Sequence, residues 1–468
     1  TTADTNDTGL GSSFTIEQLN ASKGADGVVS LREALIAANN TPGVDAIRFG
    51  FTGPAGSLGE YTIVLNSALP AITDAVVIDG FSQSALASHP LIVLDGNGVT
   101  GHGITLTATA DGSTVKGLVI RGFNGDAIHI DAGSDNHVIT GNYLGSFNAD
   151  GSDAGVSKRN LSDGVESWGS NVRIGGATAL DRNVIGGNAG RGIYLDGLNS
   201  GTRVLGNYIG TDASGTQAVA NGWGVGLARL GTATIGGTAV GEGNVISGNT
   251  LGGVLAANQR VVVQGNTVGL NAAGSSVLAN GGHGIEIRTI GASLVGGSAV
   301  GAGNVLSGNA GAGLAFYVSA VSLAPHVAQG NLIGRDRSAA LLLGNGTQGV
   351  LVAASNVLIG GTSVGEGNVI AGNAGAGIGM SSGVGGLYLG NSIHDNGGPG
   401  IDLGLDGATP NDAGDLDLGP NFLNNTPLLL TAVSNGTVTA VSGSLQVPVL
   451  TLGSVRVEFY ASNGSGEI

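Results

Sequence analysis

The sequence has no cysteine and few aromatic or basic residues, and each shortage excludes a class of protein. Without cysteine there is no disulfide framework. Aromatic residues, at 4%, are too few for an ordinary globular core. The 17 basic residues stand against 33 acidic ones, and a net charge of −16 excludes a nucleic-acid-binding protein. No apolar run reaches the roughly 20 residues that span a bilayer.

Glycine and small aliphatic residues are what the chain has in excess. The 90 glycines follow no strict three-residue period, which excludes collagen. Abundant Val and Ile, within an apolar share of 41%, argue against disorder. A core of small branched side chains suits stacked layers of short strands.

Internal repeats are the strongest signal in the chain. One Gly-Asn segment, GNYIG in its second copy, recurs at positions 141, 206, 265, 330 and 390. A second, of the type GNVISGN, recurs at 182, 243, 303 and 367, and IGG or VGG recurs at 174, 235, 295 and 359. Each unit of about 60 to 65 residues divides into two turns of three short, alternating strands. The Leu-Asn spacing of leucine-rich repeats is missing.

The repeats predict an all-β fold, a right-handed parallel β-helix of about 12 turns. Gly and Asn punctuate the corners because they tolerate left-handed backbone conformations, and stacked Asn residues can form a hydrogen-bonded ladder. We expect the solenoid over residues 61–420, preceded by a cap over residues 1–60.

Both ends of the solenoid need protection from strand pairing. Residues 30–40, SLREALIAANN, predict a short capping helix, with Ser30 and Glu33 at capping-box spacing. Residues 421–468 predict β-strands, with a turn at Ser434-Asn435-Gly436 and a final VRVEFYA strand. This tail is either a cap or the start of a sandwich domain cut off at Ile468.

The N-terminal region resembles a known group of proteins. The segments TTADTNDTG and GADGVVSLREALIAANNTPGVDAIRF resemble the signature of secreted bacterial β-helix repeat proteins, written Cys-Ser-Leu-Arg-Glu-Ala-Ile followed by Ala-Asn. Val29 stands where that signature has Cys, and Leu35 replaces Ile. The resemblance covers nearly the whole chain and implies a secreted or cell-surface bacterial protein, often adhesin-like. It implies no reaction.

Aligning the first strands of successive turns brings one group of polar and aromatic residues together. We call the following six residues the sheet C patch: His129, Asp131, Glu166, Trp168, Tyr194 and Asp196. Most other turns offer small or apolar residues at these positions. The patch predicts glycan binding, with sugar rings stacked on Trp168 and Tyr194 and with Glu166 and Asp131 accepting hydrogen bonds from sugar hydroxyl groups. Alternatively, a solvent-facing strand simply carries polar residues there.

Catalysis by the patch is the sharper alternative. Glycoside hydrolysis needs two carboxyl groups about 5 to 9.5 Å apart, and Asp131 with Glu166, or Glu166 with Asp196, are the candidate pairs beside His129. A uronate lyase would draw its cations from the loop over residues 146–163, which holds Lys158 and Arg159 and is expected to wall the patch. Gly101-His102-Gly103 resembles a motif of polygalacturonase-like hydrolases, but we expect His102 to be a turn residue.

Calcium is the candidate cation, although no cofactor is required by any of these functions. Asp412, Asp415 and Asp417 alternate with turn residues as in oxygen-ligand loops, without the spacing or distal Glu of an EF-hand. A solvated acidic linker is the alternative reading of this segment, and of Asp4 and Asp7.

The leading prediction is therefore a non-catalytic structural or adhesive module of a larger extracellular protein, with a polysaccharide or surface glycan as candidate ligand. The first alternative is a polysaccharide-active enzyme, a hydrolase rather than a lyase. The second alternative is a subunit that associates end to end into filaments.

Overall fold

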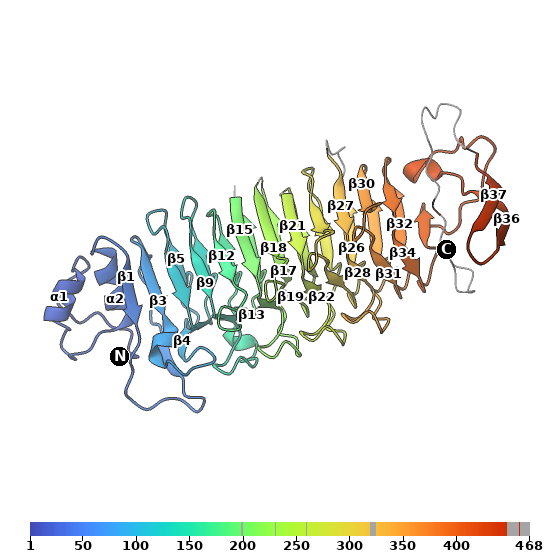
Figure 1. Cartoon of the computed structure of the whole chain (residues 1–468). Coiled ribbons are helices and arrows are strands. Elements are labelled where there is room, and N and C mark those ends of the chain that lie inside the picture. The colour runs from blue at the N-terminus through green and yellow to red at the C-terminus, as the bar shows by residue number, and fades with distance from the viewer. Residues whose placement is uncertain (198–199, 230, 259, 319–323, 447–457, 459–468) are drawn as a thin grey trace.

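The computed structural model describes all residues except 198–199, 230, 259, 319–323, 447–457 and 459–468. The chain winds into an elongated rod built from three long parallel sheets (Figure 1), with one strand of each sheet in a complete turn. We refer to the sheets as A, B and C, and to each turn of the rod as a rung. The predicted parallel β-helix of about 12 turns is confirmed, with 12 strands in each of sheets A and B and 11 in sheet C.

Sheet A contains, in spatial order, β1 (Asp45–Arg48), β3 (Val76–Asp79), β6 (Thr114–Lys116), β9 (Val138–Thr140), β12 (Arg173–Gly175), β15 (Ser200–Leu205), β18 (Thr232–Gly236), β21 (Arg260–Gln264), β24 (Leu294–Gly296), β27 (His326–Gln329), β30 (Val357–Gly360) and β33 (Leu387–Leu389). Sheet B contains β2 (Tyr61–Val64), β4 (Ile92–Asp95), β7 (Leu118–Arg121), β10 (Tyr143–Gly145), β13 (Val184–Gly186), β16 (Tyr208–Ile209), β19 (Val245–Ile246), β22 (Thr267–Val268), β25 (Val305–Leu306), β28 (Leu332–Ile333), β31 (Val369–Ala371) and β34 (Ser392–His394). Sheet C contains β5 (Ile104–Leu106), β8 (Ile128–Ile130), β11 (Val165–Ser167), β14 (Ile193–Asp196), β17 (Trp223–Ala228), β20 (Gly252–Ala256), β23 (Ile285–Ile287), β26 (Leu314–Tyr317), β29 (Val350–Ala353), β32 (Ile378–Ser382) and β35 (Ile401–Leu403).

Alternation of apolar and polar residues forms these short strands and fixes which face is inside. In β8, Ile128 and Ile130 are fully buried while His129 between them points outward. One continuous apolar core of Val, Ile and Leu side chains runs along the rod from the N-terminal helix to the last rungs. Because the strands are parallel and in register, each outward position on one rung lies directly beside its counterpart on the next.

Asparagine ladders hold two of the three corners. Buried Asn side chains stack between sheets A and B, and a second series stacks between sheets B and C. The sequence predicted a ladder at one corner, and the structure has two because both Gly-Asn repeats place an Asn at a corner.

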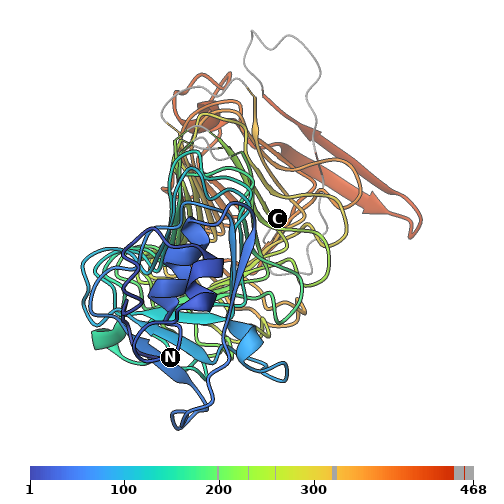
Figure 2. The same ribbon diagram turned by 90° about the vertical axis from the view of Figure 1, so that its left-hand side faces the viewer.

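Two helices cover the N-terminal end of the rod, as the end-on view in Figure 2 shows. The predicted helix is present as α2 (Leu31–Asn39), and both hydrogen bonds of its Ser30–Glu33 capping box are formed. Leu31, Leu35 and Ala38 of α2 belong to the continuous core. A shorter helix, α1 (Ile16–Ala21), was not predicted and packs against α2. The solenoid itself begins at β1, inside the range expected for the cap, because Asp45–Arg48 already pairs with β3.

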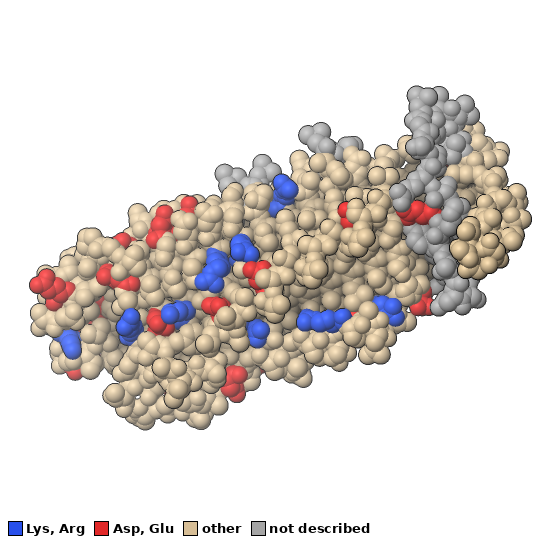
Figure 3. All heavy atoms as spheres, in the orientation of Figure 1, with Lys and Arg blue, Asp and Glu red and all other residues tan. Residues whose placement is uncertain are grey.

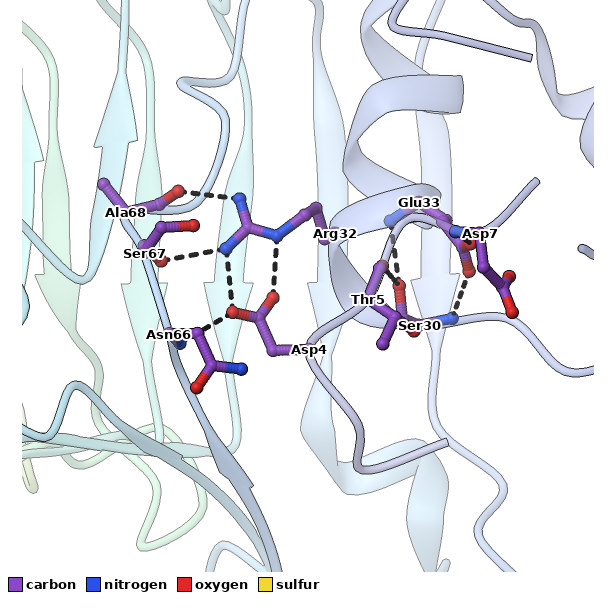
Figure 4. A network of polar contacts seen from close by, with 9 residues as sticks. All are labelled: Asp4, Thr5, Asp7, Ser30, Arg32, Glu33, Asn66, Ser67 and Ala68. Atoms are coloured by element: carbon purple, nitrogen blue, oxygen red, sulfur yellow. Dashed lines mark hydrogen bonds and ion pairs between the residues drawn. The ribbon is translucent and has the colours of Figure 1, made fainter. Parts of the chain in front are cut away.

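The residues of the N-terminal signature tie this cap to the first rungs (Figure 4). The Arg32 guanidinium donates to both carboxylate oxygens of Asp4, at 2.7 and 2.9 Å, and to the backbone carbonyls of Ser67 and Ala68. The fully buried Glu33 accepts the backbone N–H of Asp7 as well as that of Ser30. Asp4 is thus held by Arg32.

The C-terminal end carries a 3-10 turn, η3 (Pro420–Leu423), and an exposed antiparallel hairpin of β36 (Leu428–Ser434) and β37 (Thr439–Ser444) (Figures 1 and 2). The predicted turn at Ser434-Asn435-Gly436 connects these two strands. The predicted VRVEFYA strand lies outside the described residues except for Glu458. None of the described helices has the length and apolar character needed to cross a bilayer.

Candidate functional site

The sheet C patch forms as the sequence predicted. His129 on β8, Glu166 on β11 and Tyr194 on β14 are direct register partners on three successive rungs. Their strand neighbours point into the core, which turns these three side chains outward. Asp131 and Trp168 follow the ends of β8 and β11, and Asp196 ends β14.

His129 is the centre of an ionic cluster within the patch. Its Nδ1 lies 2.9 Å from Oε2 of Glu166, and its Nε2 lies 3.3 Å from Oδ1 of Asp131. The imidazole therefore stands between the two carboxylates. Burial by itself would lower the pKa of His129, but its carboxylate partners outweigh burial and raise that pKa to about 10. The ring is an imidazolium at neutral pH, and it is not poised to act as a general base.

Two residues that the sequence did not assign to the patch complete this cluster. Asp126, fully buried in the turn before β8, places Oδ2 at 3.1 Å from Nδ1 of His129 and at 2.9 Å from Nδ1 of His102. The rings of His102 and His129 stack with centroids 4.2 Å apart. Burial would raise the pKa of Asp126, but hydrogen bonds from the two histidines and other groups hold it well below its usual range. His102 is a turn residue as expected, and it also joins the site.

Asp163 is the second unpredicted carboxylate, and its pKa is shifted in the opposite direction to that of Asp126. It precedes β11 and is 5% exposed, and its carboxylate accepts the backbone N–H of Arg191. Burial raises its pKa, and despite that hydrogen bond the nearby charges of Asp126 and Glu166 help to bring the pKa to about 6. Asp163 therefore takes up a proton closer to neutral pH than an ordinary aspartate does.

A guanidinium group lies over each of the two aromatic rings of the patch. Arg191 lies over the Tyr194 ring at 3.9 Å, and Arg229 lies over the Trp168 ring at 4.8 Å. Arg229 also pairs with Asp196 at 2.7 Å and remains 58% exposed. The sequence does contain a signal for these cation–π pairs, because aromatic, acidic and basic residues occur on neighbouring rungs. It was missed because both arginines lie outside the two columns that were aligned.

The loop over residues 146–163 does not wall the patch as expected. Its first half folds over the outer face of sheet B, where Phe147 and Ala149 pack with Tyr143. Lys158 pairs with Asp95 at 2.7 Å, and Arg159 lines a cavity of about 80 Å³ beside Val219. The loop takes this course because it follows β10 of sheet B and is the first of a stacked series, in which Ala213 donates its backbone N–H to the Gly151 carbonyl.

A smaller group of the same kind lies further along sheet C. Glu286 occupies the column of Glu166, pairs with Arg288, and is followed on the next rung by Tyr317. The remaining column positions, from Gly226 to Gly379, are small or apolar apart from Glu286. Figure 3 shows the face seen in Figure 1, where acidic and basic side chains are interspersed over a largely uncharged surface.

The three aspartates proposed for calcium do come together near the C-terminal end. Asp412, Asp415 and Asp417 offer carboxylate oxygens within 4.8 Å of one another. Oδ1 of Asp412 and Oδ1 of Asp417 are buried and have no hydrogen-bond partner among the described residues. Asp415 is 5% exposed and accepts the backbone N–H of Asn425 at 2.8 Å. Oxygen donors of this kind suit Ca²⁺, and calcium binding stays a prediction.

Comparison with known proteins adds little to this geometry. No protein-family model and no curated protein sequence matches the chain. Among solved structures, the chain is similar to the A-module of the mannuronan C-5 epimerase AlgE6 from Azotobacter vinelandii, at 18% sequence identity and a TM-score of 0.37. The similarity covers 79% of this chain and 74% of that module. At this level of similarity, neither a family nor an activity follows for this chain.

Proposed function

We propose that the chain is a glycan-binding module that works outside the bacterial cell, with the sheet C patch as its binding surface. The observation that carries this proposal is the gathering of two aromatic rings, several carboxylates and two guanidinium groups on four successive rungs of one sheet. Carboxylates accept hydrogen bonds from sugar hydroxyls, guanidinium groups donate to them, and aromatic rings cover the apolar faces of sugars. Strands held in register on both sides keep these groups in fixed positions.

The charge of the site favours a neutral glycan. Five carboxylates surround the patch, at positions 126, 131, 163, 166 and 196, against two guanidinium groups and the imidazolium. The chain as a whole carries a net charge of −16. The carboxylates of the patch and the net charge of the chain would both repel a polyuronate. Lys158, which the sequence suggested could neutralise a uronate carboxylate, is paired with Asp95 instead.

An adhesive or structural role accounts for the rest of the rod. Ordered repeats with small or apolar residues on most rungs of sheet C build a stiff spacer, and one patch provides recognition. The resemblance of the N-terminal signature to secreted bacterial surface proteins supports an extracellular setting for this role.

A glycan array and a panel of neutral and acidic polysaccharides test the proposal directly. We expect the wild type to bind a neutral glycan and the Glu166→Gln, Trp168→Ala double variant to lose at least tenfold in affinity. The matched control is Glu286→Gln, Tyr317→Ala, which changes the same residue types in the same columns a few rungs away. Equal binding by the wild type and the Glu166 variant, or no binding by the wild type, would reject the proposal.

Glycoside hydrolysis is the second candidate function, and one observation favours it. Asp163 has a pKa raised to about 6 and lies three residues before Glu166, and a carboxyl group with a raised pKa is what the general acid of a glycoside hydrolase needs. The pairs expected from the sequence are less suited, since His129 separates Asp131 from Glu166 and Arg229 holds Asp196. Release of reducing ends by the wild type and its loss in Asp163→Asn would establish hydrolysis. Binding without release would leave the module non-catalytic.

A further inference from the structure

The cluster around Asp126 has the donor set of a transition-metal site. Oδ2 of Asp126 lies 2.9 Å from Nδ1 of His102 and 3.1 Å from Nδ1 of His129. Oε2 of Glu166 lies 2.9 Å from the same nitrogen of His129. Donor atoms of His102, Asp126 and His129 thus lie within 4.8 Å of one another, and Glu166 reaches His129 from the next rung. We propose that His102, Asp126, His129 and Glu166 bind a divalent transition-metal ion of the zinc class.

The spacing of the donor atoms fits such an ion. Zinc bonds of about 2.1 Å in tetrahedral geometry place neighbouring donors about 3.4 Å apart. The observed contacts of 2.9 to 3.1 Å lie slightly inside this spacing, and ligand atoms of His102, Asp126 and His129 all lie within 4.8 Å of one another. Binding therefore requires these donor atoms to move apart by a few tenths of an ångström and the stacked rings of His102 and His129 to turn toward the ion.

The chemistry of the donors selects the class of metal. Imidazole nitrogen combined with carboxylate oxygen suits Zn²⁺, Ni²⁺ and Cu²⁺, whereas Ca²⁺ and Mg²⁺ prefer all-oxygen sites. The carboxylates also supply the negative charge that a dication needs.

A second Gly-His-Gly turn in the chain provides an internal comparison. His283 occupies the same position before β23 that His102 occupies before β5, and the Nδ1 of each lies within hydrogen-bond distance of a backbone N–H, that of Ala312 and that of Asp126 respectively. On the rung that follows, His102 meets the Asp126 carboxylate, while the residue beside His283 is Ala312, which has no carboxylate. On binding a metal ion, His102 would give up its contact with the backbone N–H of Asp126 and bond to the ion instead. Of the two Gly-His-Gly turns, only that of His102 lies beside a carboxylate that can bind the same ion.

Titration with Zn²⁺ and Co²⁺ alone, on tag-free protein and without any glycan, tests the proposal. We expect calorimetry to give one equivalent bound, and Co²⁺ to give the intense visible absorption of a tetrahedral site. His102→Gln should weaken binding at least tenfold, and His283→Gln should leave it unchanged. His102→Gln changes a half-buried turn residue, and its melting curve in the absence of metal shows whether the fold is intact.

The outcomes separate this proposal from the proposed function. Absence of stoichiometric binding by the wild type, or equal binding by the wild type and His102→Gln, would overturn the metal site and establish a cluster held by protons alone. Loss of binding in His283→Gln to the same extent would also overturn it. Glycan binding is measured separately in the presence of a chelator, so that failure of either proposal is distinguishable from failure of the other.

Discussion

At the scale of single residues, the rod depends on asparagine amides that act as donor and acceptor at once. The Nδ2 group of Asn266 donates to Oδ1 of Asn304 at 3.0 Å and to the Ile235 carbonyl at 2.9 Å. Its Oδ1 accepts both the backbone N–H and the Nδ2 of Asn244. Asn266 is 1% exposed, so water does not replace these partners.

Replacing one of these residues should therefore be costly in the middle of the rod. Asn266→Ala leaves buried donors and acceptors on two neighbouring rungs without partners, and we expect a loss of about 3 kcal/mol in the free energy of unfolding. Asn396→Ala, at the end of the other ladder, should cost less because no further ladder bond follows it. Denaturant titration of both variants checks this order. Equal losses would show that the ladder bonds contribute little beyond the local turn.

The residue scale also shows why part of the site could not be predicted. His129, Glu166 and Tyr194 were aligned correctly because strand alternation fixes which side chains share a face. Asp126 and His102 lie in turns, whose side-chain directions depend on backbone angles that periodicity does not reveal. Their approach to His129 across two rungs follows from the three-dimensional winding alone.

At the scale of elements, the N-terminal cap is held by a carboxylate whose charge matters. Burial alone would raise the pKa of Asp4, but the hydrogen bonds from Arg32 and from the backbone of Asn66 lower it below the ordinary value of 3.8. A depressed pKa means that Asp4 stabilises the folded cap fully above pH 3.8 and that this contribution is lost as the pH falls further.

Asp4→Asn should reproduce the acid state at neutral pH. We expect α2 to lose about 2 kcal/mol of protection against local opening at pH 7, because hydrogen bonds to a charged group are lost, and the difference from the wild type to shrink below pH 3.8. Hydrogen exchange of the α2 amides at both pH values measures this. A difference that is independent of pH would show that Asp4 acts through its shape and not its charge.

The acidic turn near the C-terminal end supports a second prediction at this scale. If Asp412, Asp415 and Asp417 bind Ca²⁺, calcium should raise the melting temperature of the last rungs, and a chelator should reverse the gain. Asp415→Asn should abolish the effect, whereas Asp406→Asn, an exposed aspartate nearby, should keep it. Melting that is unchanged by calcium would support the solvated-linker reading of this segment.

Element prediction succeeded where a local signal was strong. Ser30 and Glu33 specify the start of α2, and Leu31 and Leu35 specify its buried face, so that this helix was located to within a residue. The six-residue helix α1 has the same kind of capping box, from Thr15 and Gln18, but too few residues for a periodic pattern. The course of the 146–163 loop depends on packing against sheet B, which its own sequence does not specify.

At the scale of the whole molecule, a solenoid of repeated rungs has a constant cross-section, so each end rung has the same strand edges and apolar side chains as an interior rung. Any end left open presents unpaired strand edges and apolar side chains to other copies. Here α2 closes the N-terminal end and extends the core beyond the first rung. End-to-end association into filaments by strand pairing, the third function considered from the sequence, would require this helix to move.

We therefore expect the wild type to sediment as a single species and the cap to be the reason. Leu31→Ala combined with Leu35→Ala removes two buried contacts between α2 and the core, each worth about 2 to 5 kcal/mol, which is enough to undock the helix. This variant should associate as its concentration rises, while Leu86→Ala, at a 95% exposed leucine, should not. Analytical ultracentrifugation over a concentration series distinguishes the outcomes. If the wild type itself forms growing linear species, the ends are interfaces and the filament hypothesis gains support. If the double variant stays a single species, a feature other than α2 prevents the rods from joining.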